Sequence, residues 1–170
     1  MTPATHLRVS QEASDAMCAS ATGALPKETG GILLGFRTGE GVYVTGALEV
    51  ADGRATSVSY RRSHRKATNQ LAAVLALEPE GSPVGYVGEW HSHPAPQPPS
   101  RQDMVAIGAT ALAAGDDIVL VVLRRIAHEW RITVTEARRA TGRSKASSDR
   151  RKSRSSRADA SPEALASDSS

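Results

Sequence analysis

Short apolar runs bounded by glycine, set between segments of helical periodicity, are the feature that most limits how this chain can fold. The run from Gly31 to Phe36 reads GILLGF, residues 84–90 read VGYVGEW, and residues 117–125 read DIVLVVLRR. Runs of this length that are rich in Val, Ile and Leu are typical of buried strands. Strands of this kind need partners on both sides, so the chain is expected to build a central sheet.

The strand-like runs also indicate how some of the strands pair. Residues 42–50, VYVTGALEV, follow the turn TGEG at 38–41, which favours an antiparallel pair with Gly31–Phe36. After the Asp52-Gly53 turn, the residues around Val58 and Tyr60 predict another short strand. Residues 117–125 and 128–134 predict a closing hairpin.

Three segments have helical periodicity. Residues 10–21 begin at Ser10, a suitable N-cap, and a third helix begins near Arg101 after Ser100. Between them, residues 65–77 predict a helix that ends before Pro79. Its expected apolar face consists of Leu71, Val74, Leu75 and Leu77. The order of helix, several strands, helix, strand, helix and two strands predicts an α+β domain in which helices pack against a mixed sheet.

Charge divides the chain into two parts. Residues 138–157 hold nine Lys or Arg residues and one acid, Asp149, among many serines. This segment and the residues after it have too little apolar bulk to offset the entropy cost of ordering. We therefore expect a folded domain at 1–137 and a disordered, basic, Ser-rich C-terminal tail at 138–170.

The composition limits which cellular compartment and which binding partners can be expected. The single cysteine, Cys18, excludes an intrachain disulfide, and no apolar stretch has the length of a signal peptide core or a membrane span. We expect a cytoplasmic protein with no membrane partner. Residues 1–137 hold twelve basic and fourteen acidic residues, so binding of nucleic acid or of an acidic partner would depend on the basic tail. The cluster Arg61, Arg62, Arg65 and Lys66 is expected to be a solvated face, although it could meet an acidic partner.

Two histidines lie one residue apart at the end of an apolar run, in GEWHSHP. Side chains alternate along a strand, so His91 and His93 project to the same side and can converge on one ion. If Ser100 caps the next helix, Asp103 lies on its first turn and can return to that ion as a third ligand. Two imidazoles and one carboxylate leave one position of a tetrahedral zinc open, which is typical of a catalytic site.

A hydrolytic zinc site also needs a group that carries protons. The sequence contains no His-Glu-x-x-His motif, so the zinc-protease helix with that motif is excluded. Glu28, in KETGGILLG, lies just before a predicted buried strand, where a carboxylate is costly unless it meets a cation or a water molecule at a metal. Glu28 is therefore the candidate proton carrier.

Together these residues resemble the signature of the JAMM metalloproteases of the JAB/MPN domain family. The matching residues are Glu28 in ETGGILLG, His91 and His93 in WHSHP, and Ser100 and Asp103 in SRQD. The resemblance covers roughly residues 6–135 and implies a central curved sheet flanked by helices. It also implies one Zn²⁺ per chain and hydrolysis of a peptide or isopeptide bond at the C-terminal tail of a ubiquitin-like or sulfur-carrier protein.

The resemblance assigns a role to each residue. His91, His93 and Asp103 would bind zinc, Glu28 would carry the proton, and Ser100 would hydrogen-bond the developing oxyanion. The family usually has ten residues between the second histidine and the aspartate, whereas Pro94–Gln102 provides nine. Without long insertions, the chain resembles a minimal, bacterial-type core. The alternative is a non-catalytic MPN-like scaffold that binds a partner, but such scaffolds typically lack metal ligands that this sequence keeps.

Overall fold

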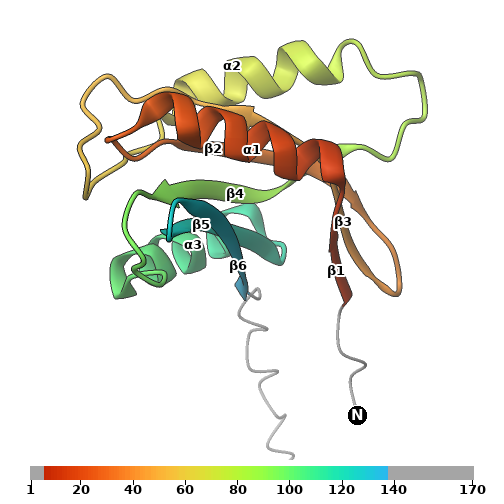
Figure 1. Ribbon diagram of the computed structural model, residues 1–170. Coiled ribbons are helices and arrows are strands. Elements are labelled where there is room, and N and C mark those ends of the chain that lie inside the picture. Colours follow the sequence, from red (N-terminus) through yellow and green to blue (C-terminus); the bar gives the residue numbers. More distant parts are fainter. Residues whose placement is uncertain (1–5, 138–170) are drawn as a thin grey trace, which may run out of the picture. The chain divides into compact units, whose positions relative to one another are not determined.

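The computed structural model describes residues 6–137, and the predicted tail at 138–170 lies outside these residues. Within the described part, strands and helices alternate as the sequence patterns indicate (Figure 1). The elements are β1 (His6–Val9), α1 (Gln11–Ala24), β2 (Gly30–Arg37), β3 (Gly41–Glu49), α2 (His64–Leu75), β4 (Gly85–His93), α3 (Arg101–Ala114), β5 (Ile118–Ile126) and β6 (Glu129–Ala137).

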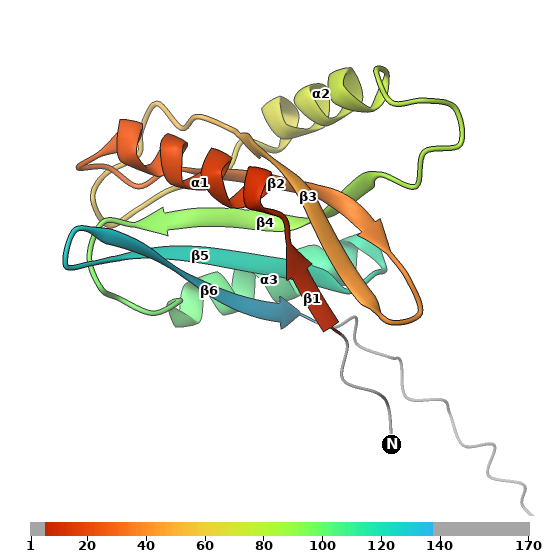
Figure 2. The same ribbon diagram turned by 45° about the vertical axis from the view of Figure 1, so that its right-hand side comes forward.

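The strands form one mixed six-stranded sheet in the order β1-β3-β2-β4-β5-β6. β2 pairs antiparallel with β3 and with β4, and β5 pairs antiparallel with β6. β1 lies parallel to β3, and β4 lies parallel to β5. Figure 2 shows that the sheet is strongly curled. The predicted α+β fold with a curved mixed sheet is confirmed, including the antiparallel β2–β3 pair and the closing β5–β6 hairpin.

The helices cover both faces of the sheet. On one face, Ala13, Met17 and Ala21 of α1 join the apolar side chains of β2, β3, β4 and β5, with Trp90 as the largest buried member. On the other face, Ile107 and Ala111 of α3 pack on β5. Ala67 of α2 packs beside them on Ile32 and Val50, over the other half of the sheet. This arrangement leaves β4 between α2 and α3. His91 and His93, two of the predicted metal ligands, lie at the end of this strand.

Two details of the predicted strands are wrong. β1 was not predicted, because four residues with two exposed or partly exposed polar side chains carry little hydrophobic signal. The strand expected around Val58 and Tyr60 does not form, and only an isolated bridge joins Thr56 to Ser59. This segment instead bonds to side chains and to a neighbouring loop, so it has no ladder of its own.

The second predicted helix ends earlier than expected. α2 stops at Leu75, and Leu77 is 86% exposed instead of lying on the buried face. The N–H groups of Leu77 and Glu78 donate to the carbonyls three residues back, at Val74 and Leu75. This tighter turn rotates Leu77 away from the core before Pro79 is reached. The predicted caps of the other two helices are confirmed, with Ser10 and Ser100 as N-caps.

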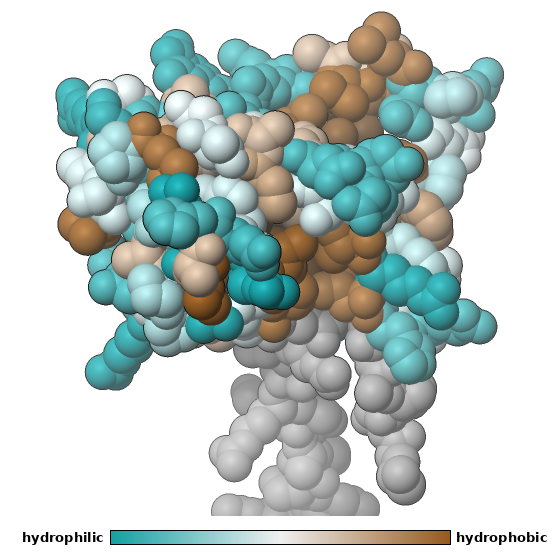
Figure 3. Space-filling model, viewed as in Figure 1, coloured by the Kyte–Doolittle hydropathy of each residue, from teal (hydrophilic) through white to brown (hydrophobic). Residues whose placement is uncertain are grey.

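No helix among residues 6–137 is long and apolar enough to cross a membrane, and the cytoplasmic location stays a prediction. The face of the molecule seen in Figure 3 carries both hydrophilic and hydrophobic residues. Figure 3 shows a hydrophobic area in the lower part of the view, where Figure 1 places the two edge strands β1 and β6. Ile132 and Val134 of β6 are 38% and 40% exposed.

A substitution at Gly31 can test how closely the backbones of β2 and β3 approach each other. A Cβ atom at Gly31 would overlap the backbone carbonyl of Leu48, whereas a Cβ at Gly85 meets nothing within 4 Å. Gly31→Ala is therefore expected to lower the free energy of unfolding by at least about 2 kcal/mol, since backbone cannot move aside as a side chain does. Gly85→Ala should change it by less than about 1 kcal/mol. Chemical denaturation of both variants checks this, and equal stabilities would contradict the close approach.

Candidate metal centre

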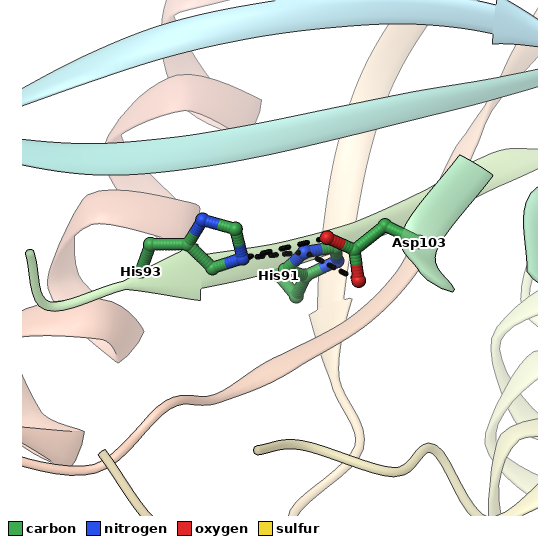
Figure 4. A group of neighbouring side chains, drawn as sticks. All are labelled: His91, His93 and Asp103. Carbon is green, nitrogen blue, oxygen red and sulfur yellow. Dashed lines mark hydrogen bonds and ion pairs between the residues drawn. The ribbon is translucent and has the colours of Figure 1, made fainter. Parts of the chain in front are cut away.

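β4 presents both histidines to one side, as the strand periodicity predicts. The Nε2 atoms of His91 and His93 lie 3.1 Å apart, and the ring centroids lie 4.9 Å apart. Figure 4 shows the two rings directed toward the same point, next to Asp103. His93 is buried, and His91 is partly buried. The rings therefore share one small volume at the end of β4.

Asp103 comes to the same point from the first turn of α3. Its Oδ1 lies 3.5 Å from Nε2 of His91, and its Oδ2 lies 3.7 Å from Nε2 of His93. A capping box orients the carboxylate: the Ser100 N–H donates to Oδ2 at 2.6 Å, and the Asp103 N–H donates to Ser100 Oγ at 3.1 Å. The start of α3 thereby fixes the direction of the aspartate.

The three side chains together form a donor set that suits a metal ion. Each offers one ligand atom, and these atoms all lie within 4.8 Å of one another. The linking loop, Pro94–Gln102, is one residue shorter than the JAMM signature, yet the structure still brings the three residues together. Imidazole nitrogens with a carboxylate oxygen fit zinc and related transition metals. His91, His93 and Asp103 can thus hold one ion.

The surroundings favour the metal-binding form of His93. Its Nδ1 lies 2.9 Å from the carbonyl oxygen of Gln97, so an Nδ1–H donor leaves the lone pair of Nε2 facing the centre. Burial lowers the pKa of His93, because desolvation disfavours the imidazolium ion. The neutral ring is the form that binds a metal ion.

Asp103 is held in the charged form. Burial by itself would raise the pKa of Asp103, but hydrogen bonds and charge from His91 and hydrogen bonds from Ser100 outweigh it. The pKa therefore lies well below its ordinary range. A carboxylate that stays ionised at neutral pH is ready to act as a ligand.

Glu28 lies beside the centre on the segment that leads into β2. It is 8% exposed, and its Oε1 is 4.0 Å from Nε2 of His93. Burial raises the pKa of Glu28 to about 6; His91 opposes this rise, and Asp103 adds to it. A buried carboxyl group with a pKa near neutrality can accept and return a proton.

Ser100 lies at the edge of the same cleft. Its Oγ accepts the hydrogen bond from Asp103, which leaves the hydroxyl hydrogen as a donor. The cleft has a volume of about 440 Å³, and both Ser100 and Glu28 line it. All five residues of the predicted site thus border one cavity, although their chemical roles stay predictions.

A pair of contacts that the sequence did not reveal holds Glu28 in place. Ser92 points away from the metal side, and its Oγ accepts the Thr29 N–H at 3.0 Å. The Ser92 N–H donates to the carbonyl of Thr29 at 2.7 Å. Next to them, a Cβ atom at Gly30 would collide with the Trp90 carbonyl, the Tyr60 ring and His91. The glycine run after Glu28 was the available signal, because repeated glycine in a strand marks close approach.

The floor of the cleft continues along β4 to a second ion pair. Nη2 of Arg62 lies 2.7 Å from Oε1 of Glu89, and the Tyr86 hydroxyl donates to the same oxygen at 3.2 Å. Arg62 is thus not part of a solvated face as expected, since its side chain is only 18% exposed. Arg62 also borders a smaller, more apolar cavity of about 330 Å³ between α2 and α3.

Comparisons with known proteins place these residues in a family. The family described as prokaryotic homologs of the JAB domain matches residues 10–133. Among solved structures, the solution structure of protein DSY2949 from Desulfitobacterium hafniense is similar at a TM-score of 0.52 and 22% identity. The match covers 78% of this chain and 90% of that one, and it supports the fold. A search of curated proteins found no significant match.

The donor set leads to a prediction about metal content. The purified protein should hold about one divalent metal ion per chain by elemental analysis. Asp103→Ala should lose it because the carboxylate ligand is gone, and Asp103→Asn should weaken it while keeping an acceptor for the helix cap. The exposed Asp15→Ala is the control and should keep the metal. Full occupancy in a His91→Ala/His93→Ala variant would show that the ion binds elsewhere.

Proposed function

Because this chain belongs to the prokaryotic homologs of the JAB domain, a family that includes metal-dependent hydrolases, we propose that it is a zinc-dependent protease. Its substrate would be a peptide or isopeptide bond at the C-terminal tail of a ubiquitin-like or sulfur-carrier protein. The observation that carries the proposal is the buried carboxyl group of Glu28, which faces the cluster of His91, His93 and Asp103 within one cleft.

The proposal assigns the metal to His91, His93 and Asp103. A bound zinc ion would supply Lewis acidity, which lowers the pKa of water to about 7 and polarises the substrate carbonyl. Three protein ligands leave a further position open for water or substrate. The ligands are oriented by their own partners, the Gln97 carbonyl for His93 and the Ser100 N–H for Asp103.

Glu28 is assigned the proton transfer. With its pKa raised to about 6 by burial, the carboxyl group is mostly ionised at neutral pH and takes up a proton easily. It would accept the proton from the attacking water and return it to the leaving amine. The two hydrogen bonds between Thr29 and Ser92 hold the neighbouring backbone, so Glu28 needs little rearrangement to act.

Ser100 is assigned to the developing oxyanion. Its hydroxyl hydrogen is not used by the capping box, in which Oγ is the acceptor. A donor fixed on the first turn of a helix costs little reorganisation when negative charge develops beside it. The partial positive charge at the start of α3 favours the same oxyanion.

An extended substrate would fit the open cleft. Residues 58–62 form one wall, the first turns of α3 form the other, and β4 forms the floor. A tail that ends in glycine can approach closely, because it has no side chains to collide with His91 and Asp103. The folded body of the substrate would supply remote contacts that are used in the transition state.

The Glu28→Gln variant tests whether Glu28 transfers protons without binding the metal. The variant should fold and keep its metal, because Glu28 is not among the proposed ligands, but the rate of cleavage should fall at least about 10²-fold. Rates and metal content of the same preparation are measured, with the exposed Glu40→Gln as the matched control. Unchanged activity in Glu28→Gln would place the base elsewhere. A wild-type protein that holds zinc and cleaves no ubiquitin-like fusion would favour the non-catalytic scaffold.

The tail of the substrate provides a second test. A fusion of a ubiquitin-like protein to a reporter should be cleaved after the terminal glycine. Gly→Val just before the scissile bond should slow cleavage strongly, because a side chain there keeps the tail from approaching His91 and Asp103 closely. The isolated tail peptide should be cleaved slowly or not at all, because it lacks the remote contacts. Equal rates for all three substrates would indicate a generic peptidase.

A further inference from the structure

The loop between β3 and α2 and the first turns of α2 concentrate positive charge beside the cleft. Residues 51–70 hold five of the twelve basic residues found in residues 1–137, together with a single acid, Asp52. Residues 1–137 as a whole hold more acids than bases. The positive charge is therefore a local feature of this segment. In Figure 1 the segment is the orange-to-yellow loop that follows β3, together with the first part of α2.

Four of these five basic side chains face solvent. Arg54, Arg61, Arg65 and Lys66 are exposed, and we call them the basic wall. The fifth, Arg62, turns inward and pairs with Glu89 on β4. Arg62 thus anchors the segment to the floor of the cleft, while the side chain of Arg61 stays exposed at its rim.

The one acid of the segment, Asp52, shapes the loop, and its single negative charge offsets only part of the four positive charges of the basic wall. The two carboxylate oxygens of Asp52 accept the N–H groups of Arg54 at 2.9 Å and of Arg61 at 3.0 Å. These bonds keep the pKa of Asp52 below its ordinary value. They also close the chain between Arg54 and Arg61 into a fixed loop, with both side chains directed outward.

Further bonds order the same loop before any partner arrives. The Tyr60 hydroxyl donates to the Val50 carbonyl at 2.9 Å, and the Glu28 N–H donates to the Thr56 carbonyl at 2.7 Å. The second bond joins the loop directly to the residue proposed as the base. A surface that is already ordered loses less entropy on binding than a flexible loop does.

The basic wall meets the substrate cleft at Arg61. Arg61 lines the cleft together with Val58, Ser59 and Tyr60, opposite the first turns of α3. Val58 is 75% exposed and offers an apolar contact at the rim. A protein whose tail enters the cleft would thus rest its body against these side chains.

We propose that the basic wall is a docking surface for a negatively charged surface on the protein substrate, next to the tail that enters the cleft. The inference rests on the proposed function and specifies its substrate: a ubiquitin-like protein with acidic residues around its tail. Opposite charges steer such a partner toward the cleft, fix its orientation and disfavour ubiquitin-like proteins with basic residues at that place.

A protein fits this surface better than a nucleic acid does. Sequence-independent binding of single strands uses aromatic side chains on which bases stack, beside a basic groove. Tyr60, the aromatic residue of this segment, is partly buried, and its hydroxyl is bonded to the backbone. The exposed apolar side chain here is Val58, which suits contact with another protein.

Charge reversal tests the docking surface. Full-length, zinc-loaded protein carrying Arg54→Glu, Arg61→Glu and Arg65→Glu is compared with a control that carries the same change at Arg8, Arg125 and Arg131, outside the cleft. Two labelled ubiquitin-like proteins serve as probes. They share one body and tail, and the residues that flank the tail are glutamates in one and lysines in the other. Binding is measured by fluorescence anisotropy in the Glu28→Gln background, which is expected not to cleave, and cleavage of the matching fusions is measured with Glu28 intact.

The expected result is tighter binding of the glutamate probe, weakened at least about tenfold by reversal of the basic wall at low salt and by less than about twofold in the control. The difference should shrink in about 0.5 M salt. Conversion of the same three arginines to lysine should preserve binding. Equal binding of both probes, or equal losses in the two triple variants, would overturn the proposal. Binding of a single-stranded oligonucleotide that depends on these arginines, with no binding of the glutamate probe, would overturn it as well.

The two proposals fail in different ways. If the protein holds zinc but cleaves neither fusion, the proposed hydrolase activity is wrong, while the anisotropy experiment still decides whether the basic wall binds an acidic partner. If both fusions are cleaved with the same KM and reversal leaves KM unchanged, the activity stands and the docking surface is wrong.

Discussion

The pairing of β2 with β4 holds the candidate site together, because it joins the segment that carries Glu28 to the strand that carries the histidines. Gly30 lies opposite His91, and Gly31 lies opposite Trp90. A Cβ atom at Gly30 would collide with the Trp90 carbonyl and with His91 on β4, and one at Gly31 would collide with Leu48 on β3, so β2 lies close to both of its neighbours. Thr29 and Ser92 add two hydrogen bonds at the end of the ladder. A buried carboxyl group is thereby held 4.0 Å from an imidazole nitrogen.

The second constraint is the start of α3. The capping box that begins this helix also aims Asp103 at the histidines, so one set of hydrogen bonds both starts the helix and positions a candidate ligand. The remaining polar groups of the floor are paired as well, with Glu89 held by Arg62 and Tyr86. Because the carboxylates of Glu89 and Asp103 both have hydrogen-bond partners, they can lie in the floor and wall of the cleft at little cost to the stability of the sheet.

These two constraints also order the walls of the cleft. Arg62 ties the loop between β3 and α2 to β4, and Asp52 closes that loop on itself. The backbone that carries the exposed Arg54 and Arg61 is therefore ordered beside the cleft that holds His91, His93 and Asp103. Proposed chemistry and proposed recognition are thus adjacent in the fold, and an ordered loop links them.

The sequence by itself determined the element types, the caps at Ser10 and Ser100, and the residues that converge, because periodicity, capping and His-x-His spacing are local properties. It did not reveal β1, the lack of a strand at Val58–Tyr60, or the exposure of Leu77. Only the tertiary structure decided the distance from Glu28 to His93 and the inward turn of Arg62 toward Glu89, whereas the exposure of Arg61, Arg65 and Lys66 agrees with the face expected from the sequence. The first two of these features depend on contacts between segments far apart in the chain, for which the local pattern contains no signal.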